Sequence, residues 1–322
     1  MVIQTVLAIF KRAFRGPVGA QPVQASPVPV LPSYFTEPSW SLRRQAVMAA
    51  LPQSMGGGFA AANAKRILGD ARAKGRRTRM HVVFNLGADA LLNFLRHGEY
   101  LNAYQRPIVN GKARQASRQR VRVDELIAAG TPENRYFCAL AMGGTGISFY
   151  GEYCAVLRSP ADEVGVRRVL DRNSFDLIRP PIQQYLAGLD KPGQRRLIDG
   201  LGADFRSVDC ADMVAIKVLQ TANAHARLIT TGTIGAALLD DEDFIEAYHE
   251  GPIAVTTLLE VRERFDEIAM EAGINARMQA GQSVPAEELL WSSRRDEIRK
   301  AAHAARIDIR GVSGSGRTKR WR

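Results

Sequence analysis

The sequence feature that most constrains the fold is an alternating segment that follows an acidic turn. Residues 240–243 are all acidic, residues 244–250 read Phe-Ile-Glu-Ala-Tyr-His-Glu, and Gly251-Pro252 ends the run. Alternate side chains of a strand point to opposite faces of a sheet, so the pattern predicts a strand with Glu246 near its middle. Glu246 is then either a solvated residue on the outer face, which is the usual case, or a fixed negative charge in the wall of a cleft.

Further strands and helices are predicted on both sides of this segment. Residues 79–86 read as a strand, and residues 87–98 read as an apolar helix that stops at Gly98. The glycine-rich link 143–146 has neither the dinucleotide-binding nor the P-loop spacing, so we interpret it as a hairpin turn. The other strand-like runs are 135–142 and 147–157, and the other helix-like runs are about 181–189, 193–200, 211–222, 257–273 and 286–307.

Composition divides the chain into six segments. They are a basic amphipathic helix at 1–16, a proline-rich linker at 17–40, a helical segment at 41–75, an α+β domain at 76–275, a basic helical extension at 276–310 and a disordered basic tail at 311–322. The helix at 1–16 is interpreted as a surface anchor, as a leader for an export machine, or as a helix that packs on the folded domain.

The net charge of +11 belongs to the ends of the chain. Residues 1–80 hold 12 Lys and Arg against 2 Asp and Glu, and residues 292–322 hold 10 against 3, whereas residues 81–291 hold 22 against 28. A duplex-binding domain places its positive charge on the folded body, so basic ends on an acidic body favour delivery, anchoring or an auxiliary contact.

The cysteines and the hydrophobic runs exclude several classes of protein. The 3 cysteines form no CxxC or Cys/His spacing, so neither a disulfide framework nor a zinc site is indicated. Because no disulfide framework is indicated, a reducing compartment is expected. No apolar run approaches the ~20 residues that a membrane-spanning helix needs.

Two arginine-rich stretches are candidates for phosphate contacts. Residues 74–79 end the helical segment, and residues 106–122 read as a charged loop. Arginine presents a forked, always-charged donor that suits a pyrophosphate. The ordinary interpretations, a solvated flank for the first stretch and a mobile solvated loop for the second, stay open beside this one.

Several local patterns follow one another along the chain. They are His81 on an early strand, the helix that leads to Gly98-Glu-Tyr100, the run 147–153, Asn173-Ser174 and the late Glu246. In their order and over about residues 76–255 they resemble ADP-ribosyltransferase-like toxin and effector domains. The resemblance implies an α+β fold with a split, mainly antiparallel β-sheet and flanking helices, to which this chain adds helical N- and C-terminal extensions.

The resemblance also implies roles for individual residues. An early-strand His or Arg holds the nicotinamide ribose side of NAD, which points to His81 with Arg79 as its competitor. A middle-strand Ser or Tyr supports the pocket, which points to Ser148 or Tyr150. The implied ligand is NAD as a substrate, with no metal, and Tyr100 is counted with the NAD-binding residues.

Glu246 takes the catalytic position in this resemblance. Breaking the nicotinamide glycosidic bond builds positive charge on the ribose carbon, so a preorganised carboxylate beside that carbon lowers the barrier. Phe244 stands two positions before it, where many protein-modifying members carry Glu or Gln, and the chain reads Ile147-Ser-Phe-Tyr150 in place of a Ser-Thr-Ser motif. The target residue therefore stays open, and plain NAD hydrolysis is allowed.

Three classes of function remain. The first is a bacterial, NAD-consuming ADP-ribosyltransferase (a glycosyltransferase) that acts as a toxin or secreted effector on an unidentified protein or nucleic acid, or that hydrolyses NAD. The second is a nucleic-acid-associated accessory protein of a mobile element or phage, and the third is a non-enzymatic structural or scaffolding protein.

The basic tail bears on where such an enzyme would act. Its arginines resemble tails that some bacterial secretion machines recognise, although such tails also bind nucleic acid. We expect the chain in the cytoplasm of the producing cell, with export to a host or target cell through secretion machinery as the alternative. The arginines are Arg310, Arg317, Arg320 and Arg322.

Overall fold

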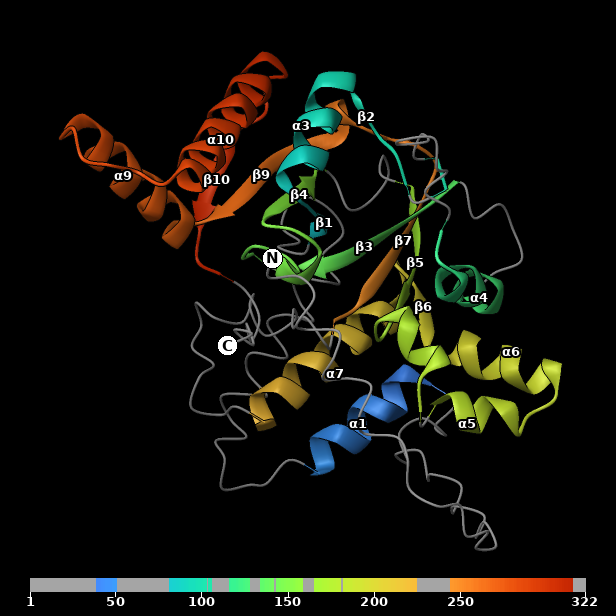
Figure 1. The fold of residues 1–322 in the computed structure, drawn as a ribbon. Helices are drawn as coiled ribbons and strands as arrows, with labels where there is room; N and C mark the ends of the chain where they lie inside the picture. Colours follow the sequence, from blue (N-terminus) through green and yellow to red (C-terminus); the bar gives the residue numbers. More distant parts are fainter. Residues whose placement is uncertain are drawn as a thin grey trace, which may run out of the picture. The chain divides into compact units, whose positions relative to one another are not determined.

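An eight-stranded sheet organises the fold (Figure 1). The computed structural model describes residues 39–50, 81–102, 104–105, 116–127, 134–141, 143–158, 165–180, 182–224 and 244–314. Within these ranges the strand order is β10-β9-β4-β1-β3-β7-β5-β6, and every neighbouring pair is antiparallel except β9 and β10. The strands are β1 (His81–Leu86), β3 (Arg135–Ala141), β4 (Tyr153–Leu157), β5 (Val166–Leu170), β6 (Gly202–Asp204), β7 (Glu246–Glu250), β9 (Leu258–Arg264) and β10 (Ile309–Val312).

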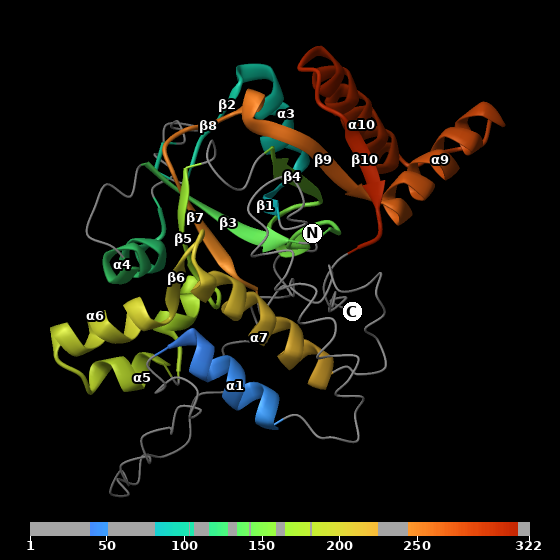
Figure 2. The same cartoon turned by 180° about the vertical axis from the view of Figure 1, so that it is seen from behind.

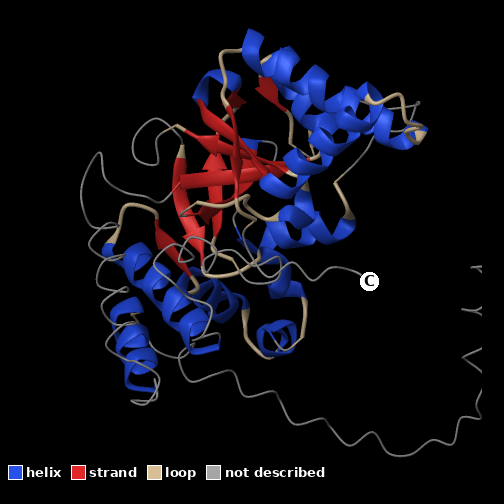
Figure 3. Cartoon of the chain, turned by 90° about the vertical axis from the view of Figure 1, so that its left-hand side faces the viewer, coloured by secondary structure: helices blue, strands red, loops and turns tan. Residues whose placement is uncertain are grey.

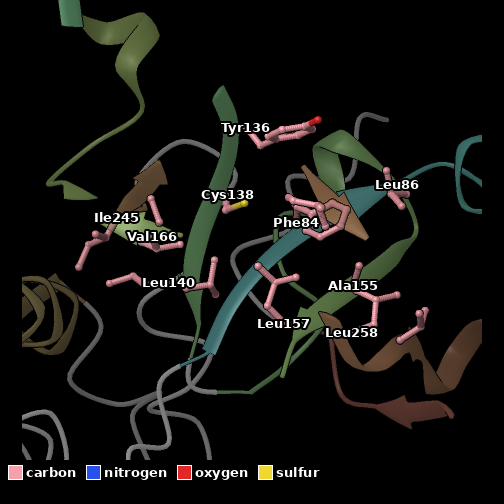
Figure 4. Close-up of a cluster of buried hydrophobic side chains, with 14 of the residues drawn as sticks. Phe84, Leu86, Tyr136, Cys138, Leu140, Ala155, Leu157, Val166, Ile245 and Leu258 are labelled. Atoms are coloured by element: carbon pink, nitrogen blue, oxygen red, sulfur yellow. The ribbon is translucent and has the colours of Figure 1, made fainter. Parts of the chain in front are cut away.

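The sheet is split between β1 and β3. These two strands pair over only three positions, from His81–Ala141 to Val83–Ala139. Beyond Val83, β1 continues along β4, whereas the other part of β3 pairs with β7. Figure 4 shows β1 and β3 running apart toward Phe84 and Tyr136. The predicted α+β class with a mainly antiparallel sheet is therefore confirmed.

A second, two-stranded sheet lies beside this split. It consists of β2 (Glu99–Tyr100) and β8 (Ile253–Ala254), which pair antiparallel. The ring centroid of Tyr100 lies 5.0 Å from that of Phe84 on β1 and 5.9 Å from that of Tyr136 on β3. Aromatic rings from three strands therefore meet where the sheet opens.

Helices cover both faces of the sheet (Figures 2 and 3). α3, α7 and α10 pack on the face that carries Leu140 and Ala247, and α4, η5, α5 and α6 pack on the face that carries Leu170 and Tyr248. The helices are α1 (Trp40–Ala50), α3 (Ala88–His97), α4 (Arg118–Ile127), α5 (Ile182–Ala187), α6 (Lys191–Gly200), α7 (Val208–Ala224), α9 (Phe265–Gln279) and α10 (Ala286–Ala304), with the short 3₁₀ helices η4 (Ser148–Tyr150), η5 (Ser174–Ile178) and η6 (Val255–Thr257). None of the described helices is long and apolar enough to cross a membrane.

The two C-terminal helices are joined to the sheet by a buried arginine. Arg295 on α10 is 1% exposed and forms ion pairs with Glu263 at the end of β9 and with Glu271 on α9. Its neighbour along the helix, Ile298, belongs to the hydrophobic core. The helix predicted at about 286–307 is therefore confirmed, and it packs into the core.

Several local predictions are wrong. The helix predicted at 257–273 is a strand, β9, as far as Arg264, and helix α9 starts at Phe265. Pairing of β9 with both β4 and β10 overrides the local helical pattern. The link 143–146 is not a hairpin turn, because β1 lies between β3 and β4 in the sheet. Part of the predicted loop 106–122 is helical, since α4 starts at Arg118.

Residues 147–157 form a strand only in their second half. Ser148–Tyr150 is the short helix η4, and β4 begins at Tyr153. Between them Gly151 lies against β1, where an added Cβ would be 2.1 Å from the carbonyl carbon of Leu86. The chain therefore passes close to the end of β1 at Gly151, and η4 does not take part in the pairing between β1 and β4.

Some predictions fall outside the described residues. These are the helix at 1–16, the linker as far as residue 38, the part of the helical segment from residue 51 onward, the arginines at 74–79 including Arg79, the loop at 106–115 and the tail from residue 315. The prediction of a disordered tail from residue 311 is wrong at its start, because Gly311 and Val312 belong to β10 and pair with β9.

Candidate active site

Glu246 lies in an apolar row at the point where the sheet divides. Val83 pairs with Ala139, and Ala139 pairs with Glu246, so the three side chains share one face. This row holds the last pairing between β1 and β3 before the split. Glu246 is 3% exposed, although its neighbours in the ladder offer it no charge. Of the two interpretations made from the sequence, the solvated outer-face residue does not apply.

One oxygen of this carboxylate is held by the protein, and the other has no partner. The backbone N–H of Ser174, in η5, donates to Oε2 of Glu246 over 2.8 Å. Oε1 is buried without a hydrogen-bond partner. A buried acceptor of this kind costs free energy unless a ligand or water satisfies it, so it marks a candidate functional group.

Burial also changes the acidity of Glu246. Desolvation raises its pKa to about 7, and this rise is opposed by the charge of Arg120 and by hydrogen bonds from Ser174. At neutral pH the carboxyl group is therefore close to its midpoint. Such a group can accept or release a proton near physiological pH, which is a common property of catalytic carboxylates.

A cleft of about 800 Å³ lies beside Glu246, in the part of the sheet where β1 and β3 separate. Aromatic side chains supply much of its wall, and their rings offer flat surfaces to planar ligand groups. They are Phe84, Tyr100, Tyr136, Phe137, Tyr150, Phe175 and Phe244. The polar lining residues include Asn85, Asn102, Arg120, Glu152, Asn173 and Glu246.

A braced loop brings Tyr150 to the cleft. Asn85 on β1 donates to the carbonyls of Thr145 and Gly151 over 2.8 and 2.9 Å, and it accepts from the N–H of Ile147 over 2.7 Å. These three bonds fix both ends of η4. The hydroxyl of Tyr150 accepts a hydrogen bond from Asn173 over 3.3 Å, and burial, followed by the charge of Glu246, raises its pKa.

The amino-terminal end of α3 forms another wall of the cleft. Residues 87–90 line it, and the N–H of Ala88 donates to Oε1 of Glu152 over 2.9 Å. The carboxylate of Glu152 therefore satisfies one of the free N–H groups at the start of this helix.

The predicted site residues separate into two groups. Glu246, Tyr100 and Tyr150 line the same cleft, whereas His81 and Ser148 are outside its lining. Arg79 is not among the described residues. The structure thus brings together three of the five predicted residues that it describes.

His81 has its own surroundings on the other side of β1. It points to the same face as Val83, but the charges that act on it come from Arg262 and Glu260 of β9. Burial lowers its pKa, as does the charge of Arg262, while Glu260 raises it, and Nδ1 has no hydrogen-bond partner. β9 and β7 lie on opposite sides of β1 in the sheet order.

Several cleft residues received no role from the sequence. Asn173 and Ser174 were part of the family pattern, but nothing in the sequence indicated that Ser174 would meet Glu246. Arg120 was one of many arginines in a predicted loop, and only long-range packing distinguishes it from the others. Tyr136 and Glu152 carry no local signal.

Known proteins give no further guidance. Comparison with protein-family models, curated proteins and solved structures finds no match for this chain. Among the residues that the structure describes, no group of three His, Cys, Asp or Glu side chains is placed to hold a metal ion.

Proposed function

We propose that the cleft binds NAD and that Glu246 assists cleavage of its nicotinamide glycosidic bond, with transfer of ADP-ribose to a macromolecule or to water. The observation that carries this proposal is the unpartnered Oε1 of Glu246, buried in the wall of a cleft of about 800 Å³. A cleft of this volume lies in the range of small-molecule sites, about 300–1,000 Å³.

The chemistry requires a negative group at this position. When the glycosidic bond breaks, both of its electrons leave with the nicotinamide nitrogen, which becomes neutral, and the ribose carbon becomes cationic. An ionised Glu246 stabilises that cation, and its low-dielectric surroundings strengthen the interaction. An oxygen nucleophile then forms the new bond and releases its proton to solvent or to a carboxylate whose pKa is near 7.

The aromatic lining supports a ligand with planar rings. Tyr100 and Tyr150, both predicted from the sequence, expose rings to the cleft beside Phe84 and Phe175. Nicotinamide and adenine are planar groups that pack well against such surfaces. The side-chain amide of Asn173 and the hydroxyl of Tyr150 add polar atoms on the side of the cleft where Glu246 lies.

The test follows the fate of labelled NAD. The purified full-length chain and its Glu246→Gln variant are incubated with NAD labelled in the adenine ring, with and without a cell lysate. Transfer predicts labelled macromolecules together with free nicotinamide, and hydrolysis predicts free ADP-ribose with nicotinamide. Both products should disappear with Glu246→Gln, and unchanged NAD in the wild-type reaction would contradict the proposal.

A further inference from the structure

Arg120 connects the cleft wall to the carboxylate through a short network. From α4 its Nε and Nη2 donate to both oxygens of Asp124, the shortest bond being 2.6 Å, and its Nη1 lies 3.4 Å from the hydroxyl oxygen of Ser174. The hydroxyl of Tyr104 donates to Oδ2 of Asp124. Ser174 then donates its backbone N–H to Glu246. The network therefore joins four chain segments.

The guanidinium of Arg120 is also enclosed by rings. Its central carbon lies 3.6 Å from the ring centroid of Phe137 on β3 and 4.9 Å from that of Phe175 in η5. Three of its four hydrogen bonds go to Asp124, so most of its donors are directed into the protein. Arg120 is thus poorly placed to clamp a pyrophosphate, although it lines the cleft.

The network acts on both the position and the charge of Glu246. Ser174 fixes Oε2, which leaves Oε1 as the oxygen without a protein partner. An opposite charge near a carboxyl group favours its ionised form. The other titratable groups that act on Glu246, or on which it acts, are Asp124, Cys138, Tyr150 and Tyr248.

We infer that Arg120 is a positioning residue, which holds Glu246 through Ser174 with one oxygen free for a ligand and favours its ionised form. The effect of Arg120 on the reaction rests on the proposed function. The effect of Arg120 on the position and ionisation of Glu246 does not, because it is independent of whether NAD is the ligand.

The test measures the titration of Glu246 directly. Carbon-13 NMR follows the side-chain carboxyl signal of Glu246, assigned by its loss in Glu246→Gln, in the wild type, in Arg120→Gln and in Arg118→Gln. Arg118 is exposed on the same helix, so its replacement is a matched charge control. Arg120→Gln should raise the midpoint by about 1 pH unit, and Arg118→Gln should leave it unchanged.

A second measurement needs no variant and covers the case in which Arg120→Gln does not fold. In the wild type, the Nε–H signal of Arg120 should titrate with the same midpoint as the Glu246 carboxyl group. Equal midpoints in Arg120→Gln and Arg118→Gln, or an Arg120 signal that does not follow the titration, would overturn the inference.

Activity adds a separate readout. Arg120→Gln should slow nicotinamide release at neutral pH about fivefold, with KM nearly unchanged, because a shift of one pH unit lowers the ionised fraction of Glu246 by about that factor. Arg120→Lys keeps the charge and should restore part of the rate. If the wild type releases no nicotinamide, the proposed function fails, and the NMR titration still decides the role of Arg120.

Discussion

The backbone N–H of Ser174 donates to Oε2 of Glu246 over 2.8 Å, across a sequence separation of 72 residues. This bond ties η5 to β7 at the row where β1 and β3 separate. It fixes a carboxylate that is buried in an apolar row and leaves its other oxygen unpartnered. The predictions below test the consequences of that arrangement.

The stability of the protein should depend on pH through Glu246. Its folded-state pKa of about 7 exceeds its ordinary value of 4.5, so between these values the folded protein keeps a proton that the unfolded chain has released. The free energy of unfolding therefore falls as pH rises through this window, by about 3 kcal/mol in total. Glu246→Gln lacks this loss. Urea unfolding of both proteins at about pH 5 and about pH 8 measures the difference, and parallel pH dependences would contradict the assignment.

Titration of Glu246 should also control the rate of the proposed reaction, which should rise with pH where the free energy of unfolding falls. Glu246 must be ionised to stabilise the ribose cation, so kcat for nicotinamide release should rise with pH and level off above a midpoint of about 7. A pH–rate profile of the wild type measures it. A rate that falls as pH rises through this midpoint would show that the protonated form acts.

Gly146 should be required for the braced loop. An added Cβ would lie 2.1 Å from Oδ1 of Asn85, and the residue has φ +67. Gly281 has the same φ with nothing within 4 Å, so Gly281→Ala carries the backbone strain without the collision. We expect Gly146→Ala to lower the free energy of unfolding by about 2 kcal/mol more than Gly281→Ala does. Equal losses in urea unfolding would show that the loop adapts without cost.

Arg295 should be far more important for stability than its neighbour Arg294. Removing Arg295 takes from the buried Glu263 its closest partner and leaves Glu271 paired with Arg299 alone, which costs about 3–5 kcal/mol. Arg294 is 41% exposed in its ion pairs with Asp89 and Glu297, so Arg294→Ala should cost less than about 1 kcal/mol. Thermal and urea unfolding of the two alanine variants provide the comparison, and similar losses would mean that α10 is held mainly by other contacts.

Sequence patterns predicted the parts of this structure that local signals determine. The helix that ends at Gly98 and the strand that carries Glu246 are both found, because a glycine stop and an alternating run are local features. Glu246 is the first residue of β7, however, and not near the middle of the strand as predicted. β9 was read as a helix, since its strand character comes from β4 and β10, which are distant in the sequence.

The candidate site was predicted less completely for the same reason. Glu246 and Tyr150 reach the cleft, but the contact between Ser174 and Glu246 depends on how η5 packs against β7. Arg120 differs from the other arginines of its stretch only in its packing against Phe137 and its bonds to Asp124. No sequence pattern distinguishes such a residue.

The most direct test of the account is the rate of nicotinamide release from NAD at about pH 8, where Glu246 is ionised. It is measured for the wild type, for Glu246→Gln and for Glu250→Gln, whose side chain lies at the exposed end of the same strand. Glu246→Gln should lose a factor of about 100 or more, and Glu250→Gln should keep the wild-type rate. Equal rates for all three proteins, or no release by the wild type, would contradict the account.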